Sequence, residues 1–274
     1  MAIQNSIVVV NYNGREKLAT MLAGLKLDEA VTSEVIVVDN ASFDESQQFV
    51  REKYPSVKLL VMKSNKGYAA AANAGVSEAR GNVVVLCHSD VVATMHSLTE
   101  LADQLREARG RRAAAMLPRL RGATGEEQPF VARLPKLTAG VVGALGAFGP
   151  RLARRGVVPA LDHVADHEYA SFACCAFDCD VLASLGGFDA GYFLYFADAD
   201  LCTRMHDRDH RILISRNVVV THTGSALGAA LPQHRTRLMR KDLARFFKKQ
   251  RPGWEQAVVG WADSTRKLVT RQGE

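Results

Sequence analysis

The feature that most limits the fold of this chain is an alternation of short apolar runs and helix-like stretches over its first ninety residues. The predicted strands are Ser6–Asn11, Glu34–Val38, Val57–Met62 and Val83–Leu86. Stretches with helical spacing separate them, at residues 14–25, 45–54 and 67–80. Short continuous apolar strands divided by helices are typical of a mostly parallel sheet that helices cover on both faces. The sequence therefore predicts an α/β fold with a Rossmann-like central sheet.

Polar residues gather where the predicted strands end, at residues 11–13, 39–42 and 88–90. Ligands of such sheets bind beyond the carboxyl ends of the strands, so we expect the binding site at this edge. Asp39 follows an apolar run and could accept hydrogen bonds from a ribose or a base imide. A carboxylate that caps the following turn through Asx geometry explains Asp39 equally well.

The later part of the chain continues the alternation less regularly. Further helices are predicted at residues 98–109, 179–185 and 238–250, and further strands at 113–118, 169–177, 211–215 and 218–221. Residues 121–165 are rich in Gly, Pro and Arg, and we expect them to be irregular and to include a mobile loop over the site.

Length and composition exclude several classes of protein. The 274 residues suit one large domain or two small ones. The longest apolar stretch, Leu137–Phe148, has about 12 residues, whereas a membrane span needs roughly 20, and the strand-like start argues against a targeting signal. The five cysteines lack C-x-x-C spacing and lie mostly in apolar runs, which favours buried thiols over disulfides or zinc ligands. A reduced, cytoplasmic setting is expected.

The net charge of +6 is concentrated late in the chain. Much of it lies in one run, which consists of Arg235, Arg237, Arg240, Lys241, Arg245, Lys248, Lys249 and Arg251. Only Asp242 opposes this run, which favours an anionic surface such as a membrane as partner. A solvated helix face, or a helix packed on its own domain, explains the run about as well. Binding to nucleic acid rests on the pI near 9.1 alone, and no recognised binding motif accompanies it, so no nucleic-acid partner is expected.

The segment Gly186–Leu201 says most about chemistry. A Gly-Gly turn leads into five aromatic residues, and the carboxylates Asp198 and Asp200 follow, where an amphipathic stretch to His210 begins. An apolar wall beside carboxylates at a loop-to-helix junction can hold an acid or a base next to a substrate. Helix N-termini also favour Asp, so either carboxylate could be only a cap.

Three further features bear on a binding site. Asp90 ends the fourth predicted strand and offers the oxygen ligand that Mg²⁺ or Mn²⁺ prefers beside substrate phosphates, although it could simply initiate a turn. His222, at the end of the last predicted strand, could be a second ligand, but a lone His is more often structural. The run Asn65–Gly75 opens with a glycine and small residues that let a ligand approach closely, or let a buried helix pack tightly.

Together these stretches resemble glycosyltransferase family 2 enzymes with the GT-A fold, particularly the bacterial rhamnosyltransferase-like branch. The matching stretches run in family order over roughly residues 5–252, and order plus spacing makes the resemblance specific. They are residues 7–13, 37–42, 65–69 with 73 and 75, 86–92, 186–202, 222–224 and 240–252.

The resemblance implies a catalytic domain at residues 1–230, with a nucleotide-sugar half at about 1–95 and an acceptor half at about 165–230. A C-terminal basic helical extension at 231–274 would follow. The implied activity is inverting transfer of a sugar from a UDP- or dTDP-sugar to a hydroxyl of a glycan, lipid-linked or small-molecule acceptor. Such an enzyme would serve cell-surface polysaccharide or glycoconjugate synthesis, in the cytoplasm or on the inner face of the membrane.

The same resemblance assigns roles to individual residues. The donor contacts would come from Asn11, Asn13, Asp39, Asn65, Gly67, Asn73 and Ser89. Asp90 and His222 match metal- or diphosphate-contacting positions and would hold Mg²⁺ or Mn²⁺. Asp198 matches the general base, with Asp200 and Tyr195 in support, and aromatic walls around it would raise its pKa.

Two positions depart from the family pattern. His88-Ser89 stands where acidic residues or Asn-Pro are usual in the metal motif, which weakens the expectation of a metal. Ala197 replaces the Glu that usually precedes the base. These departures motivate an alternative function, a catalytically silent nucleotide-sugar-binding protein of the same fold.

Overall fold

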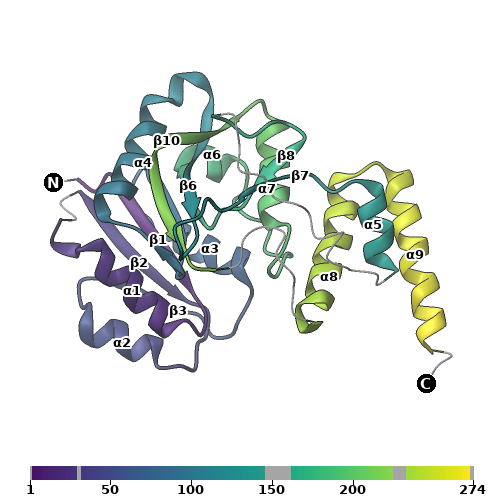
Figure 1. Cartoon of the computed structure of the whole chain (residues 1–274), viewed down its shortest axis with the longest axis horizontal. Coiled ribbons are helices and arrows are strands. Elements are labelled where there is room, and N and C mark those ends of the chain that lie inside the picture. Colours follow the sequence, from purple (N-terminus) through teal and green to yellow (C-terminus); the bar gives the residue numbers. More distant parts are fainter. Residues whose placement is uncertain (1, 30–31, 146–161, 225–232, 272–274) are drawn as a thin grey trace.

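The computed structural model describes residues 2–29, 32–145, 162–224 and 233–271, and its larger part is built on a mixed sheet (Figure 1). Among these residues the sheet has eight strands in the order β3-β2-β1-β4-β9-β6-β10-β5. They are β1 (Asn5–Asn11), β2 (Ser33–Asp39), β3 (Lys58–Val61), β4 (Val83–His88), β5 (Val91–Val92), β6 (Ala113–Arg121), β9 (Cys174–Asp178) and β10 (Arg211–His222). Only β9 and β5 pair antiparallel with their neighbours, so the predicted mostly parallel sheet is confirmed.

Helices flank this sheet. They are α1 (Arg15–Leu25), α2 (Ser46–Lys53), α3 (Tyr68–Ser77), α4 (Met95–Glu107), α6 (Cys179–Ser184) and α7 (Ala197–His206). The small residues of α3 bring it close to the sheet, because a Cβ at Gly75 would lie 2.3 Å from a methyl group of Val8. Tight packing is therefore one use of the small-residue run, as the sequence allowed.

The order of the strands makes the end of β1 the place where a ligand is expected to bind. In the parallel register Asn11 lies opposite Asp39 of β2, and Val10 lies opposite His88 of β4. The chain leaves β1 towards β2 and β3 on one side and reaches β4 on the other, so this is a topological switch point, where ligands of such sheets bind. The predicted gathering of polar strand ends is confirmed.

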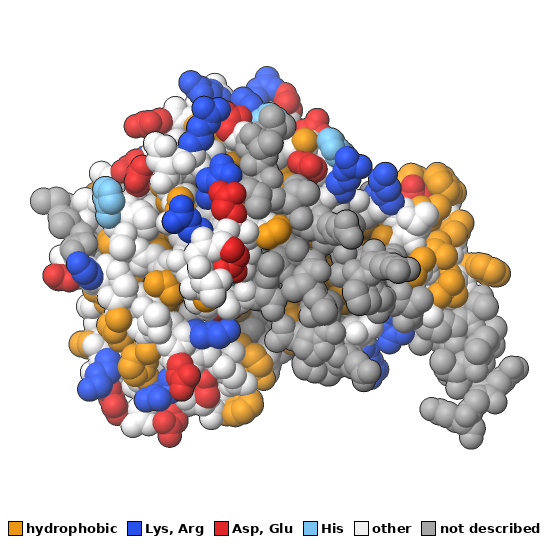
Figure 2. Space-filling view, viewed as in Figure 1, with side chains coloured by type: hydrophobic (Ala, Val, Ile, Leu, Met, Phe, Trp, Pro, Cys, Tyr) orange, Lys and Arg blue, Asp and Glu red, His pale blue; other side chains and the backbone are white. Residues whose placement is uncertain are grey.

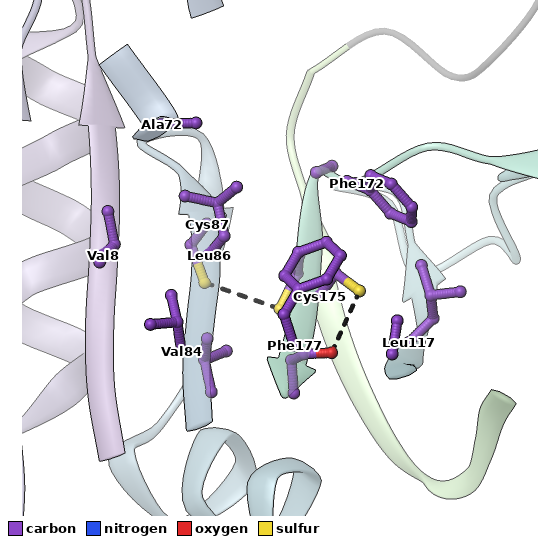
Figure 3. Close-up of a cluster of buried hydrophobic side chains, with 14 of the residues drawn as sticks. Val8, Ala72, Val84, Leu86, Cys87, Leu117, Phe172, Cys175 and Phe177 are labelled. Atoms are coloured by element: carbon purple, nitrogen blue, oxygen red, sulfur yellow. Dashed lines mark hydrogen bonds between the residues drawn. The ribbon is translucent and has the colours of Figure 1, made fainter. Parts of the chain in front are cut away.

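The core continues across the antiparallel strand β9. Figure 3 shows Cys87 of β4 beside Cys175 and Phe177 of β9, with Phe172 beyond them and Val8 of β1 on the far side. All five of these side chains are buried. The five cysteines of the chain are free thiols, as their apolar surroundings predicted.

Three sequence predictions for the middle of the chain are wrong in detail. Residues 121–165 were expected to be irregular, but they contain strand β7 (Val131–Arg133) and helix α5 (Leu137–Ala144); the rest of the predicted loop, residues 146–161, lies outside the described residues. The strand expected at 169–177 divides into β8 (Glu168–Ala170) and β9, because β8 pairs with β7 in a separate ribbon. The two strands expected at 211–221 are one strand, β10, with a register shift between Ile214 and Val219.

Two long helices end the chain, α8 (Gln233–Gln250) and α9 (Gly253–Arg271), and α5 packs against both at one end of the molecule (Figure 1). Pro252 separates the two helices because it cannot continue α8. Phe246 and Phe247 are buried among them. The basic run thus forms part of a packed helical unit, and α9, a second helix within the helical extension expected at 231–274, completes it.

Candidate active site

The strand-end polar residues Asn11 and Asp39 form a buried hydrogen-bonded pair. Oδ2 of Asp39 accepts a hydrogen bond of 3.2 Å from the side-chain amide of Asn11. Oδ1 accepts from the backbone N–H of Ser42 at 2.9 Å and from Gln47 at 2.8 Å, so the Asx-turn role also holds. The side-chain oxygen of Asn11 is buried and has no hydrogen-bond partner among the described residues. An unsatisfied buried acceptor at a ligand crevice is the kind of group that a bound hydroxyl or imide satisfies.

Two loops close around this pair. Asn13 has a left-handed φ of 49°, and its side-chain oxygen accepts from the backbone N–H of Phe43 at 3.0 Å. On the other side, the side-chain oxygen of Asn65 accepts from Asn40 at 3.0 Å and from the backbone N–H of Gly67 at 2.9 Å. Asn13 and Asn65 therefore order the two loops beside Asn11 and Asp39 through hydrogen bonds within the chain.

A second cluster consists of His88, Asp90 and His222. Within the part of the chain that the structure describes, these three residues form the one group of His, Cys, Asp and Glu with ligand atoms close enough to share a metal ion, all within 4.8 Å of one another. Oδ1 of Asp90 lies 3.4 Å from Nε2 of His222 and 3.9 Å from Nδ1 of His88. The sequence had treated His88 as a loss to the metal motif, whereas the fold places its ring beside the other two.

The orientation of the His222 ring is fixed by Gln128. Nδ1 of His222 lies 2.6 Å from the side-chain oxygen of Gln128, whose amide nitrogen donates to the carbonyl oxygens of His222 and Gly224. Because Gln128 presents an acceptor, Nδ1 must carry the proton, and in the neutral ring Nε2 then has a lone pair directed at Asp90. Two facing acceptors require a proton or a cation between them.

The space beside these atoms also suits a cation. A Cβ at Gly224 would lie 2.5 Å from Oδ2 of Asp90 and 2.7 Å from Nε2 of His222, so only glycine keeps this cradle open. Two imidazoles and a carboxylate are a donor set that Mn²⁺ accepts, and an orienting partner on the far ring nitrogen is typical of metal-binding His. The residues present therefore fit a divalent cation.

Electrostatics keep His88 and Asp90 in their metal-binding states. Burial is the main effect on His88 and lowers its pKa to about 4, so the ring is neutral at neutral pH. Burial alone would raise the pKa of Asp90, but its interactions with His222, His88 and Lys17 outweigh it and hold the pKa below the usual range. Nζ of Lys17 lies 3.5 Å from Oδ2 of Asp90.

Asp198 lies in the first turn of α7. The residue before this helix, Phe196, has a left-handed φ of 63°, which is a strained conformation for an aromatic residue. Its side chain has no group that could cap the helix by a hydrogen bond. Oδ2 of Asp198 accepts a hydrogen bond of 3.2 Å from the backbone N–H of Phe172. Burial raises the pKa of Asp198 to about 6, and the bond from Phe172 only partly opposes this. A carboxyl with such a pKa can accept a proton near neutral pH.

Tyr68 contacts both the His–Asp–His cluster and Phe172, the residue that binds Asp198. Its ring meets the ring of His88 edge to face, with centroids 4.6 Å apart. Its hydroxyl donates to the carbonyl oxygen of Phe172 at 3.3 Å, the residue whose N–H holds Asp198. Burial, and then the charge of Asp198, raise the pKa of this hydroxyl well above its ordinary value. Tyr68 thus contacts the cluster through His88 and is linked to Asp198 through Phe172.

The other predicted site residues have contacts of different kinds. Asp200 is fully buried and accepts hydrogen bonds from Tyr192, Arg204, Lys249 and Gln250. The amide of Asn73 bonds both backbone groups of Phe188, at 2.9 and 2.7 Å. The backbone N–H of Ser89 donates to Val10 at 3.1 Å, and that of Tyr195 donates to Asp242 at 2.9 Å.

The fold thus brings the predicted residues into two neighbouring regions. Asn11, Asp39 and their loops form the first, and the cluster around Asp90, linked to Asp198 through Tyr68 and Phe172, forms the second. Sequence reasoning missed four participants, which are Lys17, Tyr68, Gln128 and Phe172. Tyr68 stands within a stretch that the sequence had singled out, whereas Gln128 and Phe172 act from stretches without a recognisable pattern.

Comparison with known proteins gives this site a context. The sequence model described as glycosyl transferase family 2 matches residues 6–129. The N-acetylglucosaminyl-diphospho-decaprenol L-rhamnosyltransferase of Mycobacterium tuberculosis (strain ATCC 25618 / H37Rv) is 27% identical over 273 residues, 93% of this chain and 87% of that protein.

Two solved structures share the fold. The first is S. aureus TarS 1-349 in complex with UDP-GlcNAc, with a TM-score of 0.57 at 17% identity over 96% of this chain and 71% of that one. The mannosyltransferase PcManGT of Pyrobaculum calidifontis, in complex with GDP-Man and Mn²⁺, gives 0.53 at 15% identity over 98% and 76%. A longer TarS structure extends well beyond the similarity, since this chain spans 44% of it.

A helix that crosses a membrane must be both long and apolar. Among the described residues, no helix combines the length and the apolar character that crossing a membrane requires.

Proposed function

Because the chain belongs to glycosyltransferase family 2 and has the GT-A fold, we propose that it is an inverting enzyme that transfers a sugar from a UDP- or dTDP-sugar to an acceptor hydroxyl. The observation that carries this proposal is the placement of Asp198. Its carboxyl has a pKa raised to about 6, and Phe172 and Tyr68 link it to a His–Asp–His cluster suited to a cation. A base beside a site for a charged leaving group is what the reaction needs.

The donor nucleotide would lie at the carboxyl ends of β1 and β2. Asn11 and Asp39 offer acceptors for the base imide or the ribose, and the unpartnered oxygen of Asn11 gives one of them a reason to bind there. The exposed rings of Tyr12 and Phe43, with centroids 6.4 Å apart, stand beside this pair and offer a face for stacking the base. The name of the TarS complex, which contains UDP-GlcNAc, supports a uridine nucleotide.

His88, Asp90 and His222 would hold Mg²⁺ or Mn²⁺, and Mn²⁺ suits the two imidazoles better. When bound, the ion would neutralise the diphosphate leaving group. The protein's own part is to keep His88 neutral, Asp90 ionised and His222 in the tautomer that Gln128 dictates. Lys17, beside Asp90, adds a further positive charge near the diphosphate.

Asp198 would act as the general base. As the acceptor oxygen attacks the anomeric carbon, its hydroxyl proton passes to the Asp198 carboxylate, and the bond between that carbon and the diphosphate oxygen breaks on the opposite face. The configuration at the anomeric carbon inverts, through an oxocarbenium-like transition state. The N–H of Phe172 keeps the carboxylate oriented, and Ala197 leaves Asp198 without a neighbouring carboxylate that would raise its pKa further.

The acceptor is proposed to be lipid-linked, in polysaccharide or glycoconjugate synthesis at the inner face of a membrane. The name of the mycobacterial relative describes transfer to a diphospho-decaprenol carrier. Residues 233–271 hold eleven Lys and Arg against three Asp and Glu, although the whole chain has a net charge of only +6. Apolar side chains gather over α9 (Figure 2), where Trp254 is 62% exposed. Basic charge with exposed Trp suits an anionic bilayer surface.

The test of the proposed function is a transfer assay with purified protein. UDP- and dTDP-sugars are combined with Mn²⁺ and a polyprenyl-diphosphate-linked sugar acceptor, and the product is examined by NMR for its anomeric configuration. A product with inverted configuration supports the proposal. Nucleotide binding without metal-stimulated transfer or hydrolysis would favour the catalytically silent alternative. Sedimentation with anionic vesicles, but not with neutral ones, would support the membrane location.

A further inference from the structure

The one acidic residue in the basic helix α8, Asp242, is fully buried against the segment that leads to Asp198. Its Oδ2 accepts hydrogen bonds from the backbone N–H groups of Leu194 and Tyr195, both at 2.9 Å. Its Oδ1 accepts from the N–H of Phe193 at 3.2 Å. Three successive amides thus converge on one carboxylate, which is 0% exposed. Charge-assisted bonds of this kind are about twice as strong as neutral ones, and losing them inside a protein is costly.

The same face of α8 binds both ends of that segment. Arg245 makes a two-pronged ion pair with Asp189, with its shortest contact at 2.7 Å, and Lys249 lies 2.9 Å from the same carboxylate. Lys249 also reaches the buried Asp200, at 2.9 Å. Positions 242, 245 and 249 follow helical spacing, so they lie on one face. We name these three residues the α8 clamp.

The opposite side of the segment is fixed to the donor half. The backbone N–H of Tyr68 donates to the carbonyl oxygen of Phe193 at 2.8 Å. Gly67 makes this approach possible, because its φ is 87° and a Cβ there would lie 2.3 Å from the same oxygen. The segment is therefore held between α3 and α8, and Asp198 follows it directly.

We propose that the α8 clamp, through Asp242 above all, positions the loop 192–196 and thereby the carboxylate of Asp198. The inference rests on the proposed function, in which Asp198 is the base. Asp242 is a positioning residue, because its contacts are with backbone amides. The clamp also gives two residues of the late basic run a role within the fold, since Arg245 and Lys249 have their charges paired within the chain, and the proposed membrane contact rests on the other basic residues.

The main test is Asp242→Asn, with Lys241→Gln as the matched control, since Lys241 is the exposed neighbour on the same helix. The hydrogen-exchange rates of the amides of Phe193, Leu194 and Tyr195 report on their bonds to Asp242, and measuring them does not require an active enzyme. We expect exchange at least about tenfold faster in Asp242→Asn, and unchanged in the control. Unchanged exchange in Asp242→Asn would overturn the clamp itself.

The second readout is catalytic. We expect kcat of Asp242→Asn to fall about 10- to 100-fold while the Kd for UDP stays within about twofold, because the proposed nucleotide contacts Asn11 and Asp39 end β1 and β2 and, among the described residues, make no hydrogen bond with α8. The midpoint of the acid limb of kcat against pH should also move, which a general loss of stability would not cause. Faster exchange with unchanged kcat and an unchanged pH midpoint would overturn the positioning role.

A third variant covers the case in which Asp242→Asn fails to fold. Lys249→Met removes the contacts to Asp189 and Asp200 while keeping the apolar stem, and the same two readouts decide the outcome. Failure of the proposed function would look different, since the wild-type protein itself would then transfer no sugar while the exchange readout still reported on the clamp.

Discussion

The side-chain oxygen of Gln128 lies 2.6 Å from Nδ1 of His222, and this contact decides which ring nitrogen of His222 faces Asp90. The amide nitrogen of Gln128 is occupied by the carbonyl oxygens of His222 and Gly224, so its orientation is fixed. The ring therefore presents Nε2 to the carboxylate at 3.4 Å, in the arrangement that a shared cation stabilises.

The first prediction concerns Gln128→Leu. Without the acceptor, His222 loses its orientation, and we expect the affinity for Mn²⁺ to fall about 10- to 100-fold. Titration calorimetry with MnCl₂ measures it. Gln48→Leu is the control, because Gln48 is exposed on α2 and bonds only Glu52 one turn away. An unchanged Mn²⁺ affinity in Gln128→Leu would show that His222 is not a ligand.

The second prediction concerns the exposed ring of Tyr12 beside Asp39. If a nucleobase stacks there, Tyr12→Ala removes about 1–3 kcal/mol of binding, so the Kd for UDP rises about 5- to 160-fold. Equilibrium binding of UDP checks this. Trp254→Ala removes a more exposed aromatic ring from α9 and should leave the Kd for UDP unchanged. Equal effects of the two variants would argue against a specific stacking site.

The third prediction is the pH dependence of transfer. Asp198 must be ionised to accept a proton, and burial raises its pKa to about 6. We therefore expect kcat to rise with pH through about 6 and then level off. His88, with a pKa of about 4, is neutral throughout this range and adds no limb to the profile. A midpoint at the ordinary aspartate value would remove Asp198 from the role of base.

The raised pKa of Asp198 also determines whether the free energy of unfolding rises or falls with pH. A carboxyl whose pKa is raised on folding binds its proton more tightly in the folded state, so its contribution to the free energy of unfolding falls as pH rises from about 4 to about 6. The Asp198→Asn variant has no such loss. Urea unfolding of both proteins at pH 4 and pH 8 should show the variant gaining stability relative to wild type at the higher pH.

The fourth prediction concerns Gly67, which precedes α3 and contacts the loop 192–196. Gly67→Ala must adopt a φ of 87° and place its Cβ 2.3 Å from the carbonyl oxygen of Phe193. We expect a loss of about 2 kcal/mol or more in the free energy of unfolding. Gly125→Ala is a matched control, because Gly125 has a φ of 89° and nothing within 4 Å of its added Cβ. Equal losses of stability in the two variants would mean that the close approach of residue 67 to Phe193 does not contribute to the effect.

The parts of the site that the sequence predicted are those set by strand ends. Asn11 and Asp39 end or follow apolar runs, and parallel pairing brings the ends of such runs to one edge whatever the loops do. The position of Asp198 was also readable, because an aromatic stretch and a helix start bracket it. The hydrogen bond that Asp198 accepts from Phe172 could not be predicted, because a backbone N–H has no signature in the sequence.

The contacts that the sequence could not show are those made across long separations. Gln128 reaches His222 over 94 residues, from a stretch of Gly, Glu and Gln that reads as a loop. Asp242 stood out only as an exception in a basic run, and its partners are backbone amides. Helix α5 was hidden because a glycine-rich apolar stretch packs as a helix only when α8 and α9 cover it.

The most direct test of the account is Asp198→Asn, measured for both transfer and donor binding. The substitution keeps the shape of the side chain but removes the proton acceptor. We predict that transfer falls at least about 1000-fold while the Kd for UDP stays within about twofold. Transfer within tenfold of wild type in this variant would contradict the assignment of Asp198 as the base.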